Sequence, residues 1–288
     1  MKAPTRSQLV GFDLAYAVLW VVTVGLPVLV VRELLATLSP WVPVWVFLLV
    51  SPIAFVVFLL AMLTTVAIIR MATPRVKPGI YRYPSHPHVR VWVFHFGLNR
   101  IVSFPLWKQM IFQFATLRTY AFWALGANVS MRIHTASDPM LIDPQLITIE
   151  KGTIVGGGSL LSCHTVIGNR LALAPIHIGE GVQLHQSATI AAGVTLGRRT
   201  IVGAGTIVGP RTTTGEGVRL GATVRLGQDV VIGDNARIGD AVVCEPGVTV
   251  EAGASVPSGA HLKKKSTFVA RKRPDGNSPD SNHDVVPE

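Results

Sequence analysis

Aliphatic residues recur every six positions through the second half of the chain. Twelve of the fourteen members are Leu, Ile or Val, and glycine directly follows nine of them. An α-helix, with its period of about 3.6 residues, would not maintain this spacing. The pattern therefore predicts a solenoid of short parallel strands with one inward side chain per strand. The series is Ile178, Leu184, Ile190, Leu196, Val202, Val208, Thr214, Leu220, Leu226, Ile232, Ile238, Cys244, Val250 and Val256.

Three such strands would make one triangular coil of eighteen residues, with each inward side chain stacked on its counterpart in the next coil. A glycine after the inward residue suits a tight corner, because it has no Cβ. Charges support this coil length: Glu180, Arg198, Glu216 and Asp234 are eighteen residues apart and include opposite signs. Exposed pairs of this kind contribute little stability.

The beat is interrupted once. Ile149, Val155, Leu161 and Ile167 are six apart, and the next member, Ile178, comes eleven residues later. Five extra residues would form a bulge over Gly168–His177, a loop on a rigid scaffold of the kind that often carries function. Leu161 would then lie under Leu184. One edge of the prism would collect His164, His185, Gln186, Gly203, Ala204, Gly221 and Ala222.

The N-terminal part has a different composition. Residues 34–69 carry no charged side chain, more than the ~20 residues that a spanning helix needs. We expect a membrane anchor in residues 1–70, with helices at about 9–31 and 42–69 and a possible kink at Pro52. Basic residues before the first span and after the second place both termini on the cytoplasmic side of the inner membrane.

Residues 71–126 are rich in aromatic side chains with Arg100, Lys108 and Arg118 between them. Helices at the lipid headgroups or helices packed under the following domain both fit this composition. The solenoid is expected over 127–262. Residues 263–288 begin with three lysines and are expected to form a disordered tail, its basic part near lipid.

The net charge of +10 favours an anionic membrane surface or phosphate-bearing ligands, and no nucleic-acid recognition motif accompanies it. Two cysteines, Cys163 and Cys244, imply no disulfide framework and a reducing compartment. Cys244 occupies the inward beat and is expected in the core. Cys163 precedes His164, but neighbours on a strand point in opposite directions, so we expect a structural cysteine there.

Three motifs give the repeat a family resemblance. They are Pro175-Ile176-His177-Ile178-Gly179-Glu180-Gly181-Val182, Ala192-Gly193-Val194-Thr195-Leu196-Gly197 and Val202-Gly203-Ala204-Gly205-Thr206-Ile207-Val208. They resemble the hexapeptide-repeat family, in particular the galactoside, maltose and xenobiotic O-acetyltransferases. The entry Asp143-Pro144-Gln145-Leu146-Ile147-Thr148-Ile149 resembles that of membrane-attached relatives, which include the C-terminal part of certain membrane-bound peptide synthetases.

The resemblance implies a left-handed parallel β-helix, a homotrimer with sites between protomers, and acetyl-CoA as acyl donor without a metal. His164 falls on the family's catalytic histidine, which would act as general base toward an acceptor hydroxyl or amine. The pantetheine arm would pass Gln186, Gly203, Ala204 and Ala222. His185 is a candidate for facing the acceptor. Asp138 and Asp143 are candidates for contacting the acceptor or orienting His164, with loop capping as their ordinary alternative.

Arg219 and Arg237 precede Leu220 and Ile238, so they are expected to stack in adjacent coils. Two like charges in one column are unfavourable unless an anion bridges them. We therefore hypothesise that they bind the phosphates of CoA; two separately solvated arginines are the alternative.

The leading interpretation is a membrane-anchored acetyltransferase whose acceptor is a lipid-linked or membrane-associated glycan intermediate, a role in polysaccharide biosynthesis. A non-catalytic scaffold in a membrane assembly stays open. A γ-type carbonic anhydrase would need three zinc-binding histidines, two of them five residues apart. No pair among His134, His164, His177 and His185 has that spacing.

Overall fold

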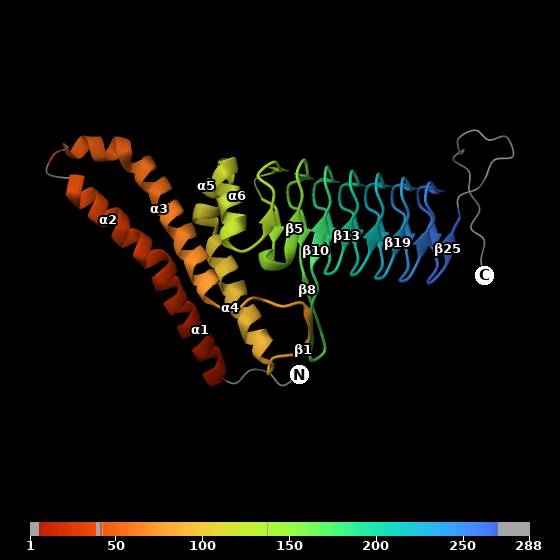
Figure 1. The fold of residues 1–288 in the computed structure, drawn as a ribbon, viewed down its shortest axis with the longest axis horizontal. Coiled ribbons are helices and arrows are strands. Elements are labelled where there is room, and N and C mark those ends of the chain that lie inside the picture. The colour runs from red at the N-terminus through yellow and green to blue at the C-terminus, as the bar shows by residue number, and fades with distance from the viewer. Residues whose placement is uncertain (1–5, 39–40, 42, 137, 270–288) are drawn as a thin grey trace. The chain divides into compact units, whose positions relative to one another are not determined.

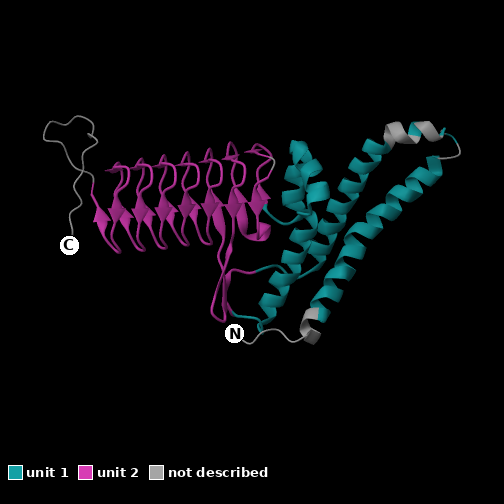
Figure 2. Cartoon of the chain, turned by 180° about the vertical axis from the view of Figure 1, so that it is seen from behind, with its two compact units in different colours: residues 1–76, 82–127 teal, residues 77–81, 128–288 magenta. Residues whose placement is uncertain are grey.

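The structure is a computed structural model and describes residues 6–38, 41, 43–136 and 138–269. The chain forms two compact units, of residues 1–76 with 82–127 and of residues 77–81 with 128–288 (Figure 2). The first unit is helical and the second is a β-solenoid (Figure 1).

The helical unit contains helices of very different length. The longest is α3, which has 29 residues and contains Pro52. The elements are α1 (Arg6–Trp20), the π-helical turn η1 (Val21–Gly25), α2 (Leu26–Leu38), α3 (Val44–Ala72), α4 (Pro87–Val102), α5 (Pro105–Gln113) and α6 (Ala115–Ala124).

Two helical stretches are long and apolar enough to cross a membrane, Val10–Leu38 and Ser51–Ala72. They correspond to the predicted spans at 9–31 and 42–69. The first stretch exposes many large aliphatic side chains, such as Val18 and Val21, whose relative exposures are 63% and 70%. Large exposed apolar surfaces are costly in water, so this surface is suited to an apolar environment.

The aromatic-rich segment folds into α4, α5 and α6, which share a core with the second half of α3. Leu63 and Val66 of α3 are completely buried in this core together with Leu98 and Ile111. The Trp107 indole N–H in this core donates to the Ile101 carbonyl at 2.7 Å. Burial also lowers the pKa of His95, whose Nε2 donates to the Pro74 carbonyl at 2.9 Å.

The solenoid has three faces of parallel strands, and the chain visits them in turn. Face 1 holds β2 (Asn128–Val129), β5 (Ile147–Ile149), β10 (Ile176–Ile178), β13 (Thr195–Leu196), β16 (Thr213–Thr214), β19 (Val231–Ile232), β22 (Thr249–Val250) and β25 (Thr267–Phe268). Face 2 holds β3 (His134–Thr135), β6 (Ile154–Val155), β11 (Gln183–Leu184), β14 (Ile201–Val202), β17 (Arg219–Leu220), β20 (Arg237–Ile238) and β23 (Ser255–Val256). Face 3 holds β4 (Met140–Leu141), β7 (Leu160–Leu161), β12 (Thr189–Ile190), β15 (Ile207–Val208), β18 (Arg225–Leu226), β21 (Val243–Cys244) and β24 (His261–Leu262).

The predicted inward beat is confirmed. From β10 onward the last residue of every strand is buried, and successive coils pair eighteen residues apart, as in Leu184 with Val202. Backbone N–H groups donate to carbonyls of the next coil, for example Gly179 N to Leu196 O at 2.9 Å. Thr214, the hydroxyl in the beat, is satisfied by the Gly197 N–H at 3.1 Å. The backbone and core are therefore shared between neighbouring coils throughout.

The predicted charge ladder is present in part. Arg198 donates to the Glu180 carboxylate at 2.8 Å across one coil. Glu216 instead lies near Arg199, at 3.6 Å, and Asp234 accepts the Glu216 backbone N–H at 2.7 Å. These contacts confirm the eighteen-residue coil, although they are exposed and each contributes little stability.

The predicted register across the break is wrong. Leu161 pairs with Ile190, and it is Val155 that pairs with Leu184. The reason is that Ile167 does not belong to the beat: its side chain is 72% exposed on a hairpin. Leu161 and Ile178 are therefore consecutive members of the inward series, separated by the usual six positions plus eleven added residues. The strands before and after the hairpin lie on the same three faces.

The solenoid also continues beyond its expected end at residue 262. The buried residue of β25, Phe268, is 5% exposed and pairs with Val250. Lys263–Lys265 form the corner between the last two strands, so these lysines do not begin a tail. Residues 270–288 of the predicted tail lie outside the described residues.

The corners predict which glycines the solenoid requires. A Cβ on Gly197 would overlap the carbonyl group of Gly215 in the next coil. Because backbone cannot move aside cheaply in a close-packed stack, we expect Gly197→Ala to lower the free energy of unfolding by about 1–3 kcal/mol. Thermal unfolding followed by circular dichroism measures this loss.

Gly253 provides the matched control. It has a positive φ of 70° and no heavy atom within 4 Å of the position that a Cβ would take, and Asn235 occupies the same corner one coil earlier with a φ of 57°. Gly253→Asn should therefore leave the unfolding temperature nearly unchanged. Equal destabilisation by the two substitutions would contradict the role assigned to inter-coil contact.

Candidate active site

The added residues leave the solenoid as an antiparallel hairpin. Strand β8 (His164–Ile167) pairs with β9 (Arg170–Leu173), and Gly168 and Asn169 form the turn between them. Strand β1 (Gly79–Arg82) pairs with β9 and completes a three-stranded sheet in the order β1-β9-β8. The hairpin satisfies its own backbone, so the coil can resume at β10 in register with β5. His164 is the first residue of this hairpin.

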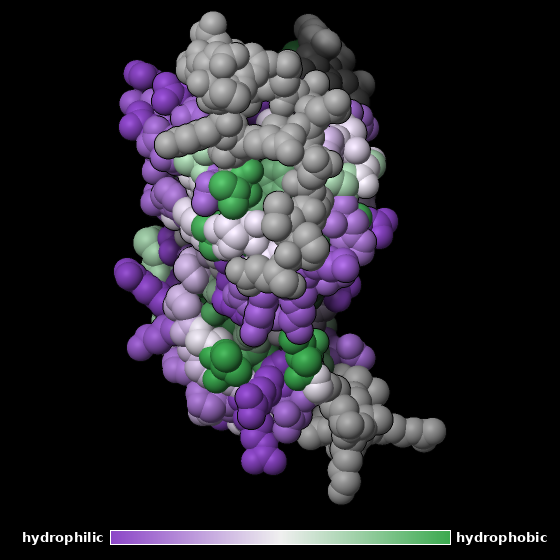
Figure 3. Space-filling view, turned by 90° about the vertical axis from the view of Figure 1, so that its right-hand side faces the viewer, coloured by the Kyte–Doolittle hydropathy of each residue, from purple (hydrophilic) through white to green (hydrophobic). Residues whose placement is uncertain are grey.

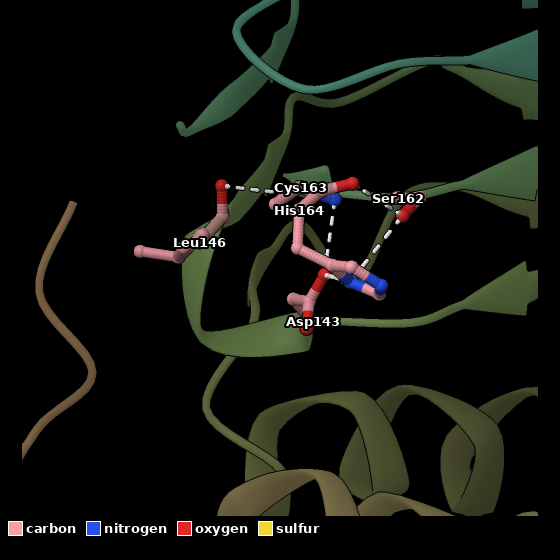
Figure 4. Close-up of polar contacts among 5 residues, drawn as sticks. All are labelled: Asp143, Leu146, Ser162, Cys163 and His164. Carbon is pink, nitrogen blue, oxygen red and sulfur yellow. Dashed lines mark hydrogen bonds and ion pairs between the residues drawn. The ribbon is translucent and has the colours of Figure 1, made fainter. Parts of the chain in front are cut away.

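A buried carboxylate fixes the His164 ring. Asp143 Oδ2 lies 2.7 Å from His164 Nδ1, and the two side chains are 2% and 23% exposed. The same oxygen accepts the Cys163 backbone N–H at 3.1 Å (Figure 4). Ser162 Oγ lies 3.5 Å from Nδ1, at the limit of a hydrogen bond. Asp143 is thus the principal partner of the imidazole.

The position of Asp143 follows from the coil before the hairpin. It stands between β4 and the short 3-10 helix η3 (Pro144–Leu146), where the chain turns from face 3 toward face 1. His164 leaves the next coil at the same corner, so stacking brings the two residues together although they are 21 positions apart. A buried carboxylate is costly unless it is paired or hydrogen-bonded, and here Asp143 Oδ2 accepts hydrogen bonds from the His164 ring and the Cys163 backbone N–H.

This arrangement gives the two ring nitrogens different roles. A carboxylate can only accept a hydrogen bond, so Nδ1 carries the hydrogen that it donates to Asp143. In the neutral ring the other nitrogen, Nε2, is then the acceptor. A histidine held in this tautomer can take a proton from a bound hydroxyl or amine, and its partly exposed ring can be reached by one.

The structure separates residues that the sequence had placed on one edge. Gln186, Gly203, Ala204, Gly221 and Ala222 lie at corners between face 2 and face 3. His164 lies at a corner between face 3 and face 1. The two edges border the two sides of face 3. The prediction of a single edge is therefore wrong, because it counted Ile167 as a member of the inward series and so placed Leu161 under Leu184.

The remaining candidates have defined surroundings. Arg219 and Arg237 pair directly in register on face 2, and both are exposed. His185 is exposed at the corner after β11. Asp138 accepts the Gly158 backbone N–H at 3.0 Å, which fits the loop-capping alternative. Asp143 contacts the His164 ring, as one of its two sequence alternatives had it, and its corner position one coil before His164 is the signal for that contact.

Among the described residues, no group of three or more His, Cys, Asp or Glu side chains could hold a metal ion.

The repeat itself is identified by comparison. Residues 175–210 match the family model described as bacterial transferase hexapeptide, six repeats. The segment thus consists of hexapeptide repeats of the bacterial transferase type, in the part of the chain that follows the hairpin. A search of curated proteins found no match in sequence.

Similar solved structures include several acyltransferases. UDP-N-acetylglucosamine acyltransferase of Francisella novicida is 16% identical over 50% of this chain and 61% of that chain, with a TM-score of 0.30. The acetyltransferase domain of PglB from Neisseria gonorrhoeae is 20% identical over 40% and 53%, with a TM-score of 0.26. AntD, an N-acyltransferase of Bacillus cereus crystallised with a dTDP-amino sugar and coenzyme A, is 16% identical over 51% and 82%, with a TM-score of 0.31. The chain thus spans about three fifths and half the length of the first two.

Both cysteines are enclosed by the solenoid. The Cys163 side chain is 0% exposed and contacts the Leu146 carbonyl at 3.5 Å. Burial, with a further contribution from the Asp143 carboxylate, raises the pKa of the Cys163 thiol far above its usual range. Burial likewise raises the pKa of Cys244 to about 12. Thiolates are the reactive form, so neither cysteine is suited to nucleophilic chemistry.

We therefore expect N-ethylmaleimide to leave the folded protein unmodified at neutral pH and to modify both thiols after denaturation. Mass spectrometry of the labelled protein measures the result. Rapid labelling of Cys163 in the folded protein would revive the nucleophile interpretation, and acetyl transfer by Cys163→Ala serves as the second readout.

Proposed function

We propose that this protein is a membrane-anchored acyltransferase that moves an acetyl or other small acyl group from acyl-CoA to a hydroxyl or amine. The observation that carries the proposal is the His164–Asp143 pair at the root of a hairpin in a hexapeptide solenoid. Hexapeptide transferases are the family that the repeats resemble. Coenzyme A and a sugar nucleotide are the molecules bound by AntD among the similar structures, and an acyl-CoA donor with a sugar-type acceptor is the combination proposed here.

His164 would act as general base. Its Nε2 accepts the acceptor's proton as the acceptor oxygen or nitrogen bonds to the thioester carbonyl carbon. It then returns that proton to the sulfur as the carbon–sulfur bond breaks, so free CoA leaves and the enzyme is regenerated. Asp143 holds the ring in the required tautomer and stabilises the transient imidazolium by its negative charge. No acyl-enzyme is needed, in keeping with the enclosed Cys163.

The donor groove is proposed at the corners between faces 2 and 3. Ala204 and Ala222 present only small side chains there, which would permit close approach of a pantetheine arm past Gln186 and Gly203. His164 lies at another edge of the same protomer. One site that uses both edges is complete only when a second copy supplies one of them, which supports the homotrimer that the family resemblance implies.

The acceptor is proposed to be a membrane-associated glycan or glycolipid. Two helices apolar enough to span a bilayer precede the solenoid. Basic residues flanking these helices favour a cytoplasmic position of the solenoid at the inner membrane, where CoA is present. Incubating the purified protein and a membrane extract with labelled acetyl-CoA, then identifying the labelled product, tests the proposal and defines the acceptor. Absence of any His164-dependent labelling would leave a scaffold as the better function.

The role of Asp143 can be separated from acceptor binding. Asp143→Asn keeps the shape of the side chain but removes its charge and its preference for one tautomer. We expect kcat to fall by about 100-fold with little change in the KM for acetyl-CoA, and His164→Ala to lose about 10²–10⁴-fold. Steady-state kinetics with both substrates measures the split.

Asp234→Asn is the control, since Asp234 also accepts a backbone N–H at a corner but lies far along the solenoid. Its kinetics should match those of the unmodified protein. If Asp143→Asn raised only the KM for the acceptor, Asp143 would belong to the acceptor site, as one of the sequence alternatives had it.

Arg219 and Arg237 are proposed to bind the phosphates of CoA. Neither has an ion pair with any described residue, and their direct pairing places two like charges side by side. A bound phosphate would relieve that repulsion through charge-assisted hydrogen bonds. The double variant Arg219→Ala, Arg237→Ala should raise the KM for acetyl-CoA by about 10-fold or more, because hydrogen bonds to charged groups contribute about 1.5–3 kcal/mol.

Arg225→Ala is the matched control, because Arg225 also begins an Arg-Leu strand, β18, but on face 3. It should leave the KM for acetyl-CoA unchanged. A normal KM in the double variant would mean that the two arginines are simply solvated.

A further inference from the structure

The three-stranded sheet outside the solenoid is enclosed on one face near its base, at Leu171 and Leu173, and is exposed on both faces at its tip, where Val166 and Ile167 point to opposite sides. Val166 pairs with Leu171 and Ile167 pairs with Arg170, so directly opposed residues share a face. Leu171 and Leu173 are 0% and 3% exposed. Ile167 and Arg170 lie on the opposite, exposed face. The hairpin therefore ends in an aliphatic side chain beside a cation, with its anchoring residues turned inward.

Aliphatic side chains at this end of the sheet are unusually exposed. Ile167 is 72% exposed and Val166 43%, while Ile80, on the neighbouring strand β1, is 70% exposed. The aliphatic residues of the solenoid beat are almost completely buried by comparison. Figure 3 shows hydrophobic and hydrophilic side chains next to one another at the lower end of the face drawn there. Exposed aliphatic side chains that gather on a water-facing surface mark an interaction site.

The charged residues of the two segments that form this end of the sheet have a single sign. Lys77 and Arg170 are exposed, and neither forms an ion pair among the residues that the structure describes. No acidic residue occurs in 77–82 or in 164–173. Aliphatic side chains flanked by unpaired cations fit the interface of an anionic bilayer. The acyl region receives the aliphatic side chains, and the lipid phosphates attract the cations.

The chain keeps this sheet near the bilayer that α3 would cross. Residues 73–78 are all that separates Ala72, at the end of α3, from Gly79, at the start of β1. Fully extended, this connection covers at most about 25 Å. In any arrangement of the two units, β1 therefore remains within reach of the membrane surface.

We propose that the hairpin tip, defined as Ile80, Val166 and Ile167 with Lys77 and Arg170, rests in the headgroup layer of an anionic phospholipid bilayer. The inference rests on the proposed membrane anchoring but not on acyl transfer. His164 lies three residues before Ile167 on β8, about 10 Å along the strand. The tip would thereby hold the catalytic histidine at the depth where the reactive head of a lipid-linked acceptor is presented.

The test uses the full chain in lipid nanodiscs. Ile167→Cys is labelled with an environment-sensitive maleimide fluorophore, which the enclosed Cys163 and Cys244 should not take up. Val231→Cys on face 1 is the matched control, since Val231 is 47% exposed on a strand of the solenoid. The nanodiscs contain phosphatidylcholine with phosphatidylglycerol, or phosphatidylcholine alone, with headgroup-region spin-labelled phospholipid as quencher.

The expected result is that the quencher removes more than about half of the fluorescence at residue 167 and less than about a tenth at residue 231. Quenching at 167 should fall at least about twofold without phosphatidylglycerol or in the Lys77→Gln, Arg170→Gln background, because the electrostatic attraction is then lost. Recovery of the labelled chain in nanodiscs, measured first, reports the anchoring separately.

Three outcomes would overturn the inference. Incorporation into nanodiscs with equal, weak quenching at residues 167 and 231 would show that the tip stays in water. Efficient disulfide cross-linking of unlabelled Ile167→Cys between copies in detergent, without lipid quenching, would show that a second copy covers the tip. Failure to incorporate would refute the anchoring on which the inference rests, and the inference with it.

Discussion

The hydrogen bonds between consecutive coils constrain every other feature of the solenoid. Each coil leaves its N–H groups and carbonyls for its neighbours, and a single inward side chain per strand fills the interior. A segment that does not fit the six-residue step cannot be absorbed inside this stack. It must leave, satisfy its own backbone and return where the next strand of face 1 can still pair with β5. The antiparallel hairpin β8–β9 meets that requirement, and the family-model match follows directly after it.

The position of the proposed catalytic histidine follows from the same constraint. His164 is where the chain departs from the stack, so its backbone belongs to the hairpin while Cys163 still faces the core. At a departure point the side chain is neither enclosed by the next coil nor fully in solvent. The preceding coil supplies Asp143 at the same corner, and its buried oxygen binds both the ring and the Cys163 N–H. A rigid stack thereby orients a ring on a segment that has left the stack.

Local periodicity made much of this fold predictable from sequence. The inward series from Ile178 to Val256 and the two apolar helices correspond to what the structure shows. The register across the break was not predictable from period alone, because Ile167 is an aliphatic residue at the right spacing by coincidence. The Gly168-Asn169 pair between β-branched and aliphatic residues was the available signal for a two-residue hairpin turn. Counting from Val155 to Leu184 without Ile167 would have given the observed faces.

The geometry of the site, like the fold around the break, could not be predicted without the register of the coils. His164 was identified through a family resemblance, whereas its pairing with Asp143 depends on which corner each residue occupies, and that requires the register. Once the register is known, the candidates fall on two edges, with His164 on one and the corner residues around Ala204 on the other. An acyl transfer that uses both edges therefore depends on how copies of the prism are packed. Among the described residues of the solenoid unit, the hairpin that carries His164 leaves the coils, and its exposed Ile167 is the side chain on which the proposed membrane contact depends.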